Sequence, residues 1–179
     1  MKDKDISKYL SLVLRHQPTL LGITLDTEGW TEVSLLLIKL QSKGMPVDFG
    51  RLKQVVDSND KKRFAFNEDF TKIRASQGHS VSVDLGLEPR QPPEFLYHGT
   101  AETNIQAILA EGIQKRSRQH VHLSADLSTA EKVGRRHGKP CILLVKSGEM
   151  YLEGLLFYQS ENKVWLTDYV NPRYLQVIK

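Results

Sequence analysis

The sequence predicts an α+β protein in two parts, and three observations support this fold class. In the first part, three stretches with apolar residues at helical spacing precede an alternating stretch typical of a β-hairpin. A proline-rich linker follows over residues 81–94. In the last part, short strand-like runs outnumber helical ones, which indicates a mostly β domain. We therefore expect one domain over residues 1–90 and a second over residues 91–179.

Composition bounds the class of protein. The chain has 179 residues, of which 40% are hydrophobic and 26% charged, as in folded soluble proteins. No apolar run approaches the roughly 20 residues that cross a membrane, and the charged N-terminus predicts no secretory signal. Cys141 is the only cysteine, which excludes intramolecular disulfides and cysteine-based zinc sites. We expect a cytoplasmic monomer without a membrane partner, and the net charge of +4 weakly favours polyanions.

Three helices are expected in the first domain, over residues 6–14, about 32–42, and after Asp48. Pro18 disfavours helix at Gln17, so Arg15 and His16 fall at the end of the first helix. Thr31 is expected to cap the second helix and Asp48 the third.

A β-hairpin is expected after these helices, over residues 61–66 and 71–74. Three helices followed by a hairpin suggest a winged helix, a domain that commonly holds nucleic acid. Its basic residues would bind the phosphates of the nucleic-acid backbone. The alternative for Lys61 and Lys62 is that they are ordinary solvent-exposed residues of the hairpin. No aromatic residue is offered for base stacking, so we expect no sequence-specific reading. The candidate nucleic-acid contacts are Lys61, Lys62 and Arg74, with Gln77 and His79 in the loop that follows the hairpin.

The second domain is expected to contain two helices, over about residues 105–111 and 128–137, ended by Gly112 and Gly138. Asp126 is expected to cap the second of them. Strands are expected over residues 95–97, 121–124, 141–145, 155–158, 164–167 and 174–178. The glycine-rich signatures of Rossmann and P-loop domains are absent from the sequence, so neither of these two nucleotide-binding domains is expected.

Two similar motifs, His98-Gly99-Thr100 and His122-Leu123-Ser124, mark a candidate ligand site. We expect the first strand to break at His98, with Gly99 permitting a sharp turn and a close ligand. Residues i and i+2 of a strand share a face, so each motif presents an imidazole and a hydroxyl together. Two such motifs on neighbouring strands would surround a polyhydroxylated or phosphorylated ligand. Neither offers a carboxylate or thiolate, so no metal is predicted.

Basic residues gather between positions 115 and 139, which suggests phosphate chemistry or, alternatively, a solvated helix face. They are Lys115, Arg116, Arg118, Lys132, Arg135, Arg136 and Lys139.

Six blocks of sequence, in order and in register, resemble the NAD-dependent RNA 2′-phosphotransferases from about residue 7 to the C-terminus. These blocks are Leu14-Arg15-His16, Lys61-Lys62-Arg63-Phe64, Ile73-Arg74-Ala75-Ser76-Gln77-Gly78-His79-Ser80, Tyr97-His98-Gly99-Thr100, Val121-His122-Leu123-Ser124 and Asn162-Lys163-Val164-Trp165-Leu166-Thr167.

The resemblance implies a winged-helix N-terminal lobe and an ADP-ribosyltransferase-like C-terminal lobe that binds NAD. It implies transfer of an internal RNA 2′-phosphate to NAD in two steps. The phosphate first attacks the nicotinamide ribose C1″ and expels nicotinamide. The ribose 2″-OH then attacks phosphorus, which frees the RNA 2′-OH and leaves ADP-ribose 1″,2″-cyclic phosphate.

The resemblance also assigns residues to the reaction. The catalytic ones are Arg15, His16, Arg63 and Arg136, with the adjacent Arg135 as the other candidate for the last position. The NAD contacts are Tyr97, His98, Gly99, Thr100, His122, Leu123, Ser124 and Val164. Guanidinium forks suit phosphate oxygens, and His16 could protonate the departing 2′-oxygen. Val164 stands where many ADP-ribosyltransferases have a glutamate, a change that suits a phosphate nucleophile.

Two other functions remain open on the sequence. A metal-free phosphoesterase of the two-histidine type would use His98 and His122 as acid and base without NAD. A basic RNA-binding module would use the histidines only for packing and hydrogen bonding.

Overall fold

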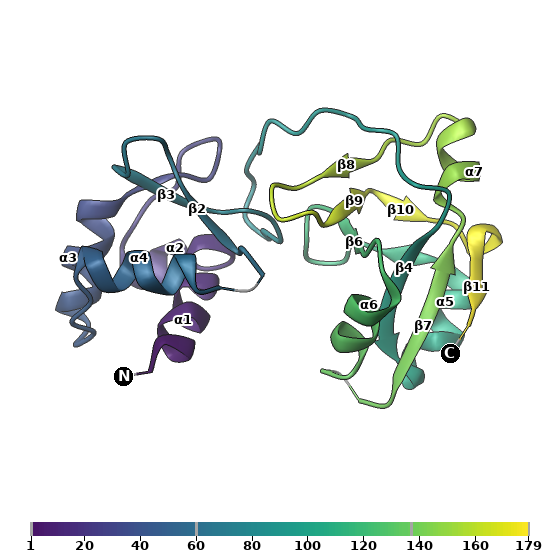
Figure 1. Cartoon of the computed structure of the whole chain (residues 1–179), viewed down its shortest axis with the longest axis horizontal. Helices are drawn as coiled ribbons and strands as arrows, with labels where there is room; N and C mark the ends of the chain where they lie inside the picture. Colours follow the sequence, from purple (N-terminus) through teal and green to yellow (C-terminus); the bar gives the residue numbers. More distant parts are fainter. Residues whose placement is uncertain (1, 60, 137, 179) are drawn as a thin grey trace. The chain divides into compact units, whose positions relative to one another are not determined.

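The chain divides into two compact units, over residues 1–86 and 87–179 (Figure 1). The computed structural model describes residues 2–59, 61–136 and 138–178. The division falls inside the proline-containing segment that was expected to link the domains. Helices and small open sheets occur in both units, so the prediction of a mixed α and β protein is confirmed.

In the described residues, the N-terminal unit combines four α-helices with a three-stranded antiparallel sheet of order β1-β3-β2. Its elements are α1 (Asp3–Arg15), α2 (Pro18–Leu21), β1 (Thr31–Glu32), α3 (Val33–Ser42), α4 (Phe49–Asp57), β2 (Phe64–Phe66) and β3 (Lys72–Ala75). The expected hairpin is confirmed as the pair β2–β3. The short helix α2 and strand β1 were not predicted, because neither is long enough to show a period.

One apolar core holds the N-terminal unit together. The stripe Ile6, Leu10, Val13 and Leu14 makes one face of α1 fully buried, as helical spacing predicts. The cap predicted at Asp48 is confirmed, since its carboxylate accepts the Arg51 N–H at 2.8 Å.

The cap predicted at Thr31 is wrong. Thr31 pairs with Ile73 in β1, Glu32 precedes α3, and that helix has no side-chain cap. The sheet uses the backbone around Thr31, so its side chain does not serve the helix.

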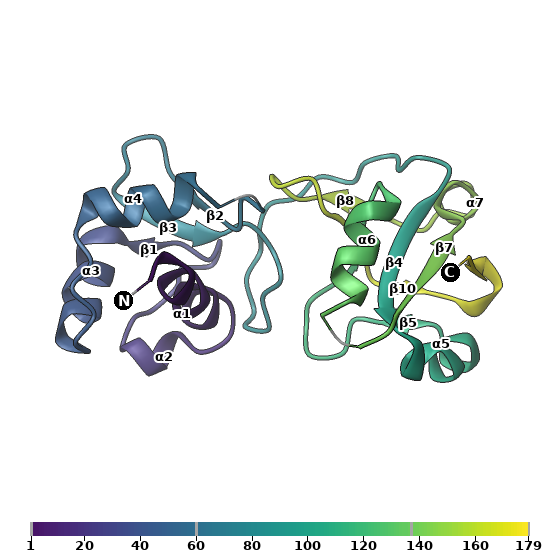
Figure 2. The same cartoon turned by 60° about the horizontal axis from the view of Figure 1, so that its bottom comes forward.

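The C-terminal unit is built on the antiparallel sheet β11-β7-β4, with a second sheet of order β6-β9-β8 and the pair β10-β5. Its strands are β4 (Leu96–Ala101), β5 (Ile113–Gln114), β6 (Val121–Leu123), β7 (Pro140–Val145), β8 (Tyr158–Gln159), β9 (Trp165–Thr167), β10 (Tyr169–Val170) and β11 (Leu175–Val177). Its α-helices are α5 (Ile105–Glu111), α6 (Leu127–Gly134) and α7 (Ser147–Leu152), with 3-10 turns Glu102–Asn104 and Pro172–Tyr174. Helix α6 packs against β4 and β7, and Figure 2 shows it beside β4.

Three expectations for this unit need correction. The strand β4 does not break at His98 but continues through Gly99 and Thr100 to Ala101, paired with β7 throughout. The strand expected over residues 155–158 is only Tyr158–Gln159, since Leu155 and Leu156 are exposed and outside any strand. The helix expected to reach residue 137 ends at Gly134, and residue 137 lies outside the described residues. The cap at Asp126 is confirmed by its bond from the Thr129 N–H.

Candidate functional site

Arg15 occupies the last turn of α1, and its guanidinium is held between two distant segments. Its Nη2 donates to the backbone carbonyl of Arg63 at 3.3 Å. A β-carbon added to Gly78 would lie only 3.5 Å from Arg15 Nη1, so the guanidinium packs against this glycine. Gly78 has φ +87°, a backbone conformation that residues other than glycine rarely adopt. The backbone around the arginine therefore fixes its position.

His16 follows Arg15 at the C-cap of α1 and is bound by the same loop. Its Nδ1 lies 2.9 Å from Ser80 Oγ. The Ser80 N–H also donates to the Arg15 carbonyl at 2.9 Å, and Val81 N–H reaches the same oxygen at 3.3 Å. The loop satisfies an orphan carbonyl of the helix end and so holds His16 and Arg15 together.

His79 lies between Gly78 and Ser80 and is 1% exposed. Neither ring nitrogen has a hydrogen-bond partner among the residues that the structure describes. Burial, together with the charges of Arg15, His16 and Arg74, lowers the pKa of His79 from 6.5 to about 4. The ring is therefore neutral at pH 7, and its burial anchors the loop that holds Arg15 and His16.

The low pKa of His79 predicts acid destabilisation. The folded pKa lies below the unfolded one, so the stabilisation is complete above pH 6.5 and declines as the pH falls towards 4. At about 1.4 kcal/mol per pKa unit, this group alone should remove about 3 kcal/mol of unfolding free energy. Urea unfolding at intervals from pH 7 to 4 measures the decline. A His79→Leu variant should lose less unfolding free energy over this pH range. Parallel plots of unfolding free energy against pH for the two proteins would contradict the low pKa of His79.

A groove of about 600 Å³ runs beside Arg15 in the N-terminal unit. Its lining residues come from α1, the end of α4 and the turn before β2: Asp3, Lys4, Ser7, Lys8, Ser11, Arg15, Val55, Ser58, Asn59, Lys61 and Arg63. Two of the predicted catalytic arginines and one predicted RNA contact thus line one groove. Arg63 Nη1 donates to Asn59 Oδ1 at 3.5 Å, which holds its side chain at the wall.

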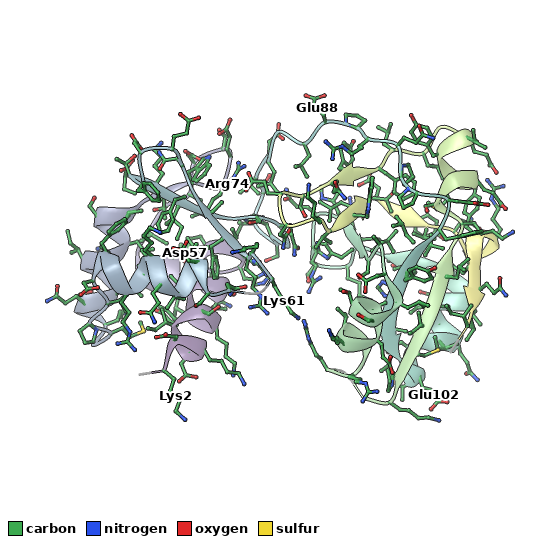
Figure 3. All side chains as sticks on the ribbon, in the orientation of Figure 1. Lys2, Asp57, Lys61, Arg74, Glu88 and Glu102 are labelled. Carbon is green, nitrogen blue, oxygen red and sulfur yellow. The ribbon has the colours of Figure 1, made fainter. Side chains whose placement is uncertain are left out.

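The other predicted RNA contacts lie outside this groove. Figure 3 labels Lys61, in the turn before β2, and Arg74, on β3. The Arg74 guanidinium lies over the Trp30 ring, 4.4 Å from its centroid. Lys62 donates to the Asp57 carbonyl at 3.0 Å, and Gln77 is half-buried in the loop after β3. His79, as described, is out of reach of solvent.

In the C-terminal unit the two histidine motifs lie side by side. Tyr97 and Ser124 exchange backbone hydrogen bonds of 2.9 and 2.8 Å, which joins β4 to the end of β6. The Nδ1–H of half-buried His98 donates to the His122 carbonyl at 3.2 Å, which leaves Nε2 as an acceptor. Burial lowers the pKa of His98, so its ring is neutral at pH 7.

Arg118 fixes the ring of His122. Its Nη1 lies 2.6 Å from His122 Nδ1. A guanidinium can only donate, so Nδ1 accepts and the ring proton resides on Nε2. The two imidazoles therefore hold opposite tautomers, His98 protonated on Nδ1 and His122 on Nε2.

Gly99 gives α6 access to the sheet. A β-carbon there would lie 1.7 Å from the Ala130 carbonyl oxygen, so the close approach is made by the helix. Alternate residues of an antiparallel strand direct their backbone groups to opposite edges. Tyr97 bonds to Ser124 rather than to β7, and Gly99 has the same parity. The Gly99 N–H and C=O therefore point to the edge of β4 that is turned away from β7.

The remaining predicted NAD contacts are mixed in exposure. Thr100 is 6% exposed, and its Oγ1 accepts from Asn104 Nδ2 at 3.2 Å. Leu123 is fully buried in the core. Val164 is half-buried just before β9, where its N–H donates to Ser160 Oγ at 3.1 Å.

Arg135 and Arg136 differ in their partners. Arg135 pairs with Glu131 at 2.9 Å, one turn back on α6. Arg136 is exposed, and its side chain has no partner among the described residues.

The described part of the chain contains no group of three or more His, Cys, Asp or Glu residues that could hold a metal ion. Across the same residues, no helix has the length and apolar character of a membrane span.

Arginines fixed at a basic groove and neutral histidines paired on a sheet are typical of an enzyme that handles phosphate-bearing substrates. Comparisons with known proteins identify the family. The profile of the family "RNA 2'-phosphotransferase, Tpt1 / KptA family" matches residues 1–169. The chain therefore belongs to this family, as the six sequence blocks indicated, and it is an enzyme that removes the 2′-phosphate from RNA.

Three relatives illustrate the match, and each is named a probable RNA 2′-phosphotransferase. The protein of Flavobacterium johnsoniae is 57% identical over 97% of this chain and 95% of its own. That of Agrobacterium fabrum is 52% identical over 96% and 92%. That of Hahella chejuensis is 50% identical over 99% and 95%.

Several residues that contact the candidate site were not predicted from the sequence. Ser80 was quoted only within a motif, and Arg118 only within a basic stretch. The spacing of Arg118 four residues before His122 is the one signal that could have found it. The groove residues Lys4, Lys8 and Asn59 gave no signal, because exposed polar residues on helices and turns are common.

Proposed function

We propose that the enzyme uses NAD as co-substrate and transfers the RNA 2′-phosphate to it through a 2′-phospho-ADP-ribosylated RNA. In this proposal the N-terminal unit is a winged-helix lobe for RNA, and the C-terminal unit is an ADP-ribosyltransferase-like lobe for NAD. The three-stranded sheet and the helices before its hairpin support the first assignment. We expect a monomer that acts in the cytoplasm.

The observation that carries the NAD proposal is the position of Gly99. Its N–H and C=O lie together on an edge of β4, beside the bridge from Tyr97 to Ser124. One donor and one acceptor side by side complement a carboxamide, which is the polar group of nicotinamide. His98 and His122 flank that bridge, and His98 Nε2 would accept from a ribose hydroxyl.

Phosphate handling is proposed for Arg15, Arg63 and His16. Guanidiniums remain charged at all working pH values and bind phosphate oxygens in pairs. In the second step charge spreads over the oxygens on phosphorus, and each fixed donor there contributes about 3 kcal/mol of transition-state stabilisation. His16, oriented by Ser80, would protonate the departing RNA 2′-oxygen. A His16→Ala enzyme with a second step at full speed would exclude this role.

Arg136 is proposed over Arg135 as the remaining catalytic arginine. Arg135 is already neutralised by Glu131, whereas Arg136 keeps its full charge for a ligand. An Arg136→Gln enzyme should therefore be much less active than an Arg135→Gln enzyme.

The test of the function is an RNA oligonucleotide with one internal 2′-phosphate, incubated with and without NAD. NAD-dependent loss of the phosphate with release of nicotinamide supports the proposal. Loss of phosphate without NAD would support the two-histidine phosphoesterase instead. Binding without any reaction would support a non-catalytic RNA-binding module.

Replacing Ser80 with alanine tests how His16 is positioned. The change removes the hydroxyl beside His16 Nδ1 and leaves the backbone bond from Ser80 to Arg15 intact. Losing one hydrogen bond of about 1 kcal/mol should slow the second step about fivefold. Single-turnover assays would show accumulated ADP-ribosylated RNA and an altered pH profile. Ser80→Thr should restore the rate, and Ser82→Ala, at an exposed position, should match the wild type. A Ser80→Ala enzyme with unchanged rate and profile would refute the role.

A further inference from the structure

The basic groove of the N-terminal unit extends well beyond the two arginines proposed to bind the reacting phosphate. Along α1 it is lined by Lys4, Ser7, Lys8, Ser11 and Arg15, which recur every three or four residues. This spacing places them on one face of the helix. At 1.5 Å per residue, the stripe from Lys4 to Arg15 is about 16 Å long, which exceeds the backbone of a single nucleotide.

The polar stripe is distinct from the face of α1 that packs in the core. Ile6, Leu10, Val13 and Leu14 are at most 1% exposed, whereas Lys4 and Lys8 are exposed. Helix α1 thus has one face committed to folding and another that forms a wall of the groove.

Charge in the groove is strongly one-sided. Five cationic side chains line it, namely Lys4, Lys8, Arg15, Lys61 and Arg63. Among the described residues of the lining, Asp3 is the one carboxylate, and it pairs with Arg51 at 3.3 Å. Within the residues that the structure describes, Lys4 and Lys8 have no carboxylate partner. The groove is therefore suited to a chain of anions rather than to a single one.

Asn59 connects two of the segments that line the groove. Its Nδ2 donates to Ser7 Oγ at 3.0 Å, and its Oδ1 accepts from the Lys61 N–H at 3.1 Å and from Arg63 Nη1. One side chain thus ties α1 to the turn that carries Lys61 and Arg63. The spacing between the lysine stripe and Arg63 is set before any ligand binds.

None of the described residues that line the groove has an aromatic side chain that could stack on a base. Lysine ammonium groups bind phosphates as point charges without reading sequence. We propose that this groove holds the RNA backbone adjoining the reacting nucleotide, with Lys4 and Lys8 contacting flanking phosphates. The assignment rests on the proposed function, because Arg15 and Arg63 define where the reacting phosphate lies. It predicts that the enzyme prefers longer RNA irrespective of its sequence.

Two substrates and two variants test this proposal. The substrates are an eight-nucleotide RNA with one internal 2′-phosphate and a dinucleotide with the same group. The test variant is Lys4→Gln/Lys8→Gln. The control is Lys39→Gln/Lys43→Gln, which removes the same charge at the end of α3, outside the groove. Thermal unfolding checks that both variants fold.

Binding of the octamer is measured without NAD over a range of salt concentrations. The slope of log affinity against log salt should fall by about 0.7 for each RNA phosphate that the variant no longer neutralises. The test variant should bind the octamer roughly tenfold more weakly in low salt, while the control keeps the wild-type slope. Dinucleotide binding should be unchanged in both.

Equal slopes for the test variant and wild type, or equal reductions in affinity for octamer and dinucleotide, would overturn the proposal. A test variant no weaker than the control would do the same. The proposed function is tested separately, by asking whether the wild type removes the 2′-phosphate from the dinucleotide when NAD is present. The dinucleotide has no flanking backbone to fill the groove, so this reaction does not depend on the groove. The two failures are therefore distinguishable.

Discussion

Replacing Gly99 with alanine is expected to destabilise the C-terminal unit by about 3 kcal/mol, the upper range for overpacking a filled core. The added β-carbon would lie 1.7 Å from the Ala130 carbonyl oxygen and 3.0 Å from the Gly134 nitrogen. Both are backbone atoms of α6, so no side-chain rotation can relieve the contact. The helix would have to move off β4, and the change should appear as a lower midpoint in chemical or thermal unfolding.

Gly50 provides the control for that experiment. A β-carbon at Gly50 would meet only Asp48 Oδ1, at 3.6 Å, and the residue lies in the first turn of α4. Gly50→Ala should leave stability unchanged or raise it by about 0.5 kcal/mol through lower entropy of the unfolded chain. Equal midpoints for the Gly99 and Gly50 variants would show that α6 can move without cost.

Gly99 also shows where sequence reasoning stops. Gly99 was expected to admit a ligand close to the backbone, whereas the group that lies against it in the structure is the Ala130 carbonyl of α6. The expected turn was wrong because β4 remains paired with β7 through Ala101. Pairing partners are set by tertiary structure, which can extend a strand through a residue of low strand propensity.

Features of the fold that depend only on neighbouring residues were predicted well, and those that depend on distant segments were not. Asp48 and Asp126 were identified as caps because a cap bonds only to backbone three residues away. Thr31 had the same local signal and was misread, because β3 competed for its backbone. The exposed Leu155 and Leu156 looked like a strand, since an apolar run does not by itself distinguish a strand from a loop over a core.

For the same reason, the local position of the candidate site residues could be predicted, but their long-range contacts could not. Pro18 placed Arg15 and His16 at the end of α1, which the structure confirms. Their hydrogen bonds to Arg63 and Ser80 join residues 48 and 64 positions apart, and no periodicity spans such distances. The lysines of α1 have the pattern of any solvated helix face, so only the groove distinguishes them.

Arg63→Gln is expected to lower kcat by about 10²- to 10³-fold, the loss typical of removing one donor to a developing oxyanion. The Arg63 backbone carbonyl, not its side chain, accepts the bond from Arg15. Ser76 N–H also donates to that carbonyl, at 2.8 Å. The substitution therefore removes one guanidinium and leaves the anchor of the other in place. Single-turnover assays with the 2′-phosphorylated octamer and saturating NAD measure the loss.

Two further variants decide what the Arg63 side chain supplies. Arg63→Lys keeps a positive charge but loses the planar fork, so it should recover only a small part of the rate if both phosphate oxygens are bound. Arg173→Gln removes an exposed arginine that pairs with Glu153 and should leave kcat unchanged. If Arg63→Lys were as active as wild type, a point charge would suffice and Arg63 would steer the RNA rather than stabilise the transition state. If Arg63→Gln itself retained full activity, phosphate handling would fall to Arg15 and the proposed catalytic set would be wrong.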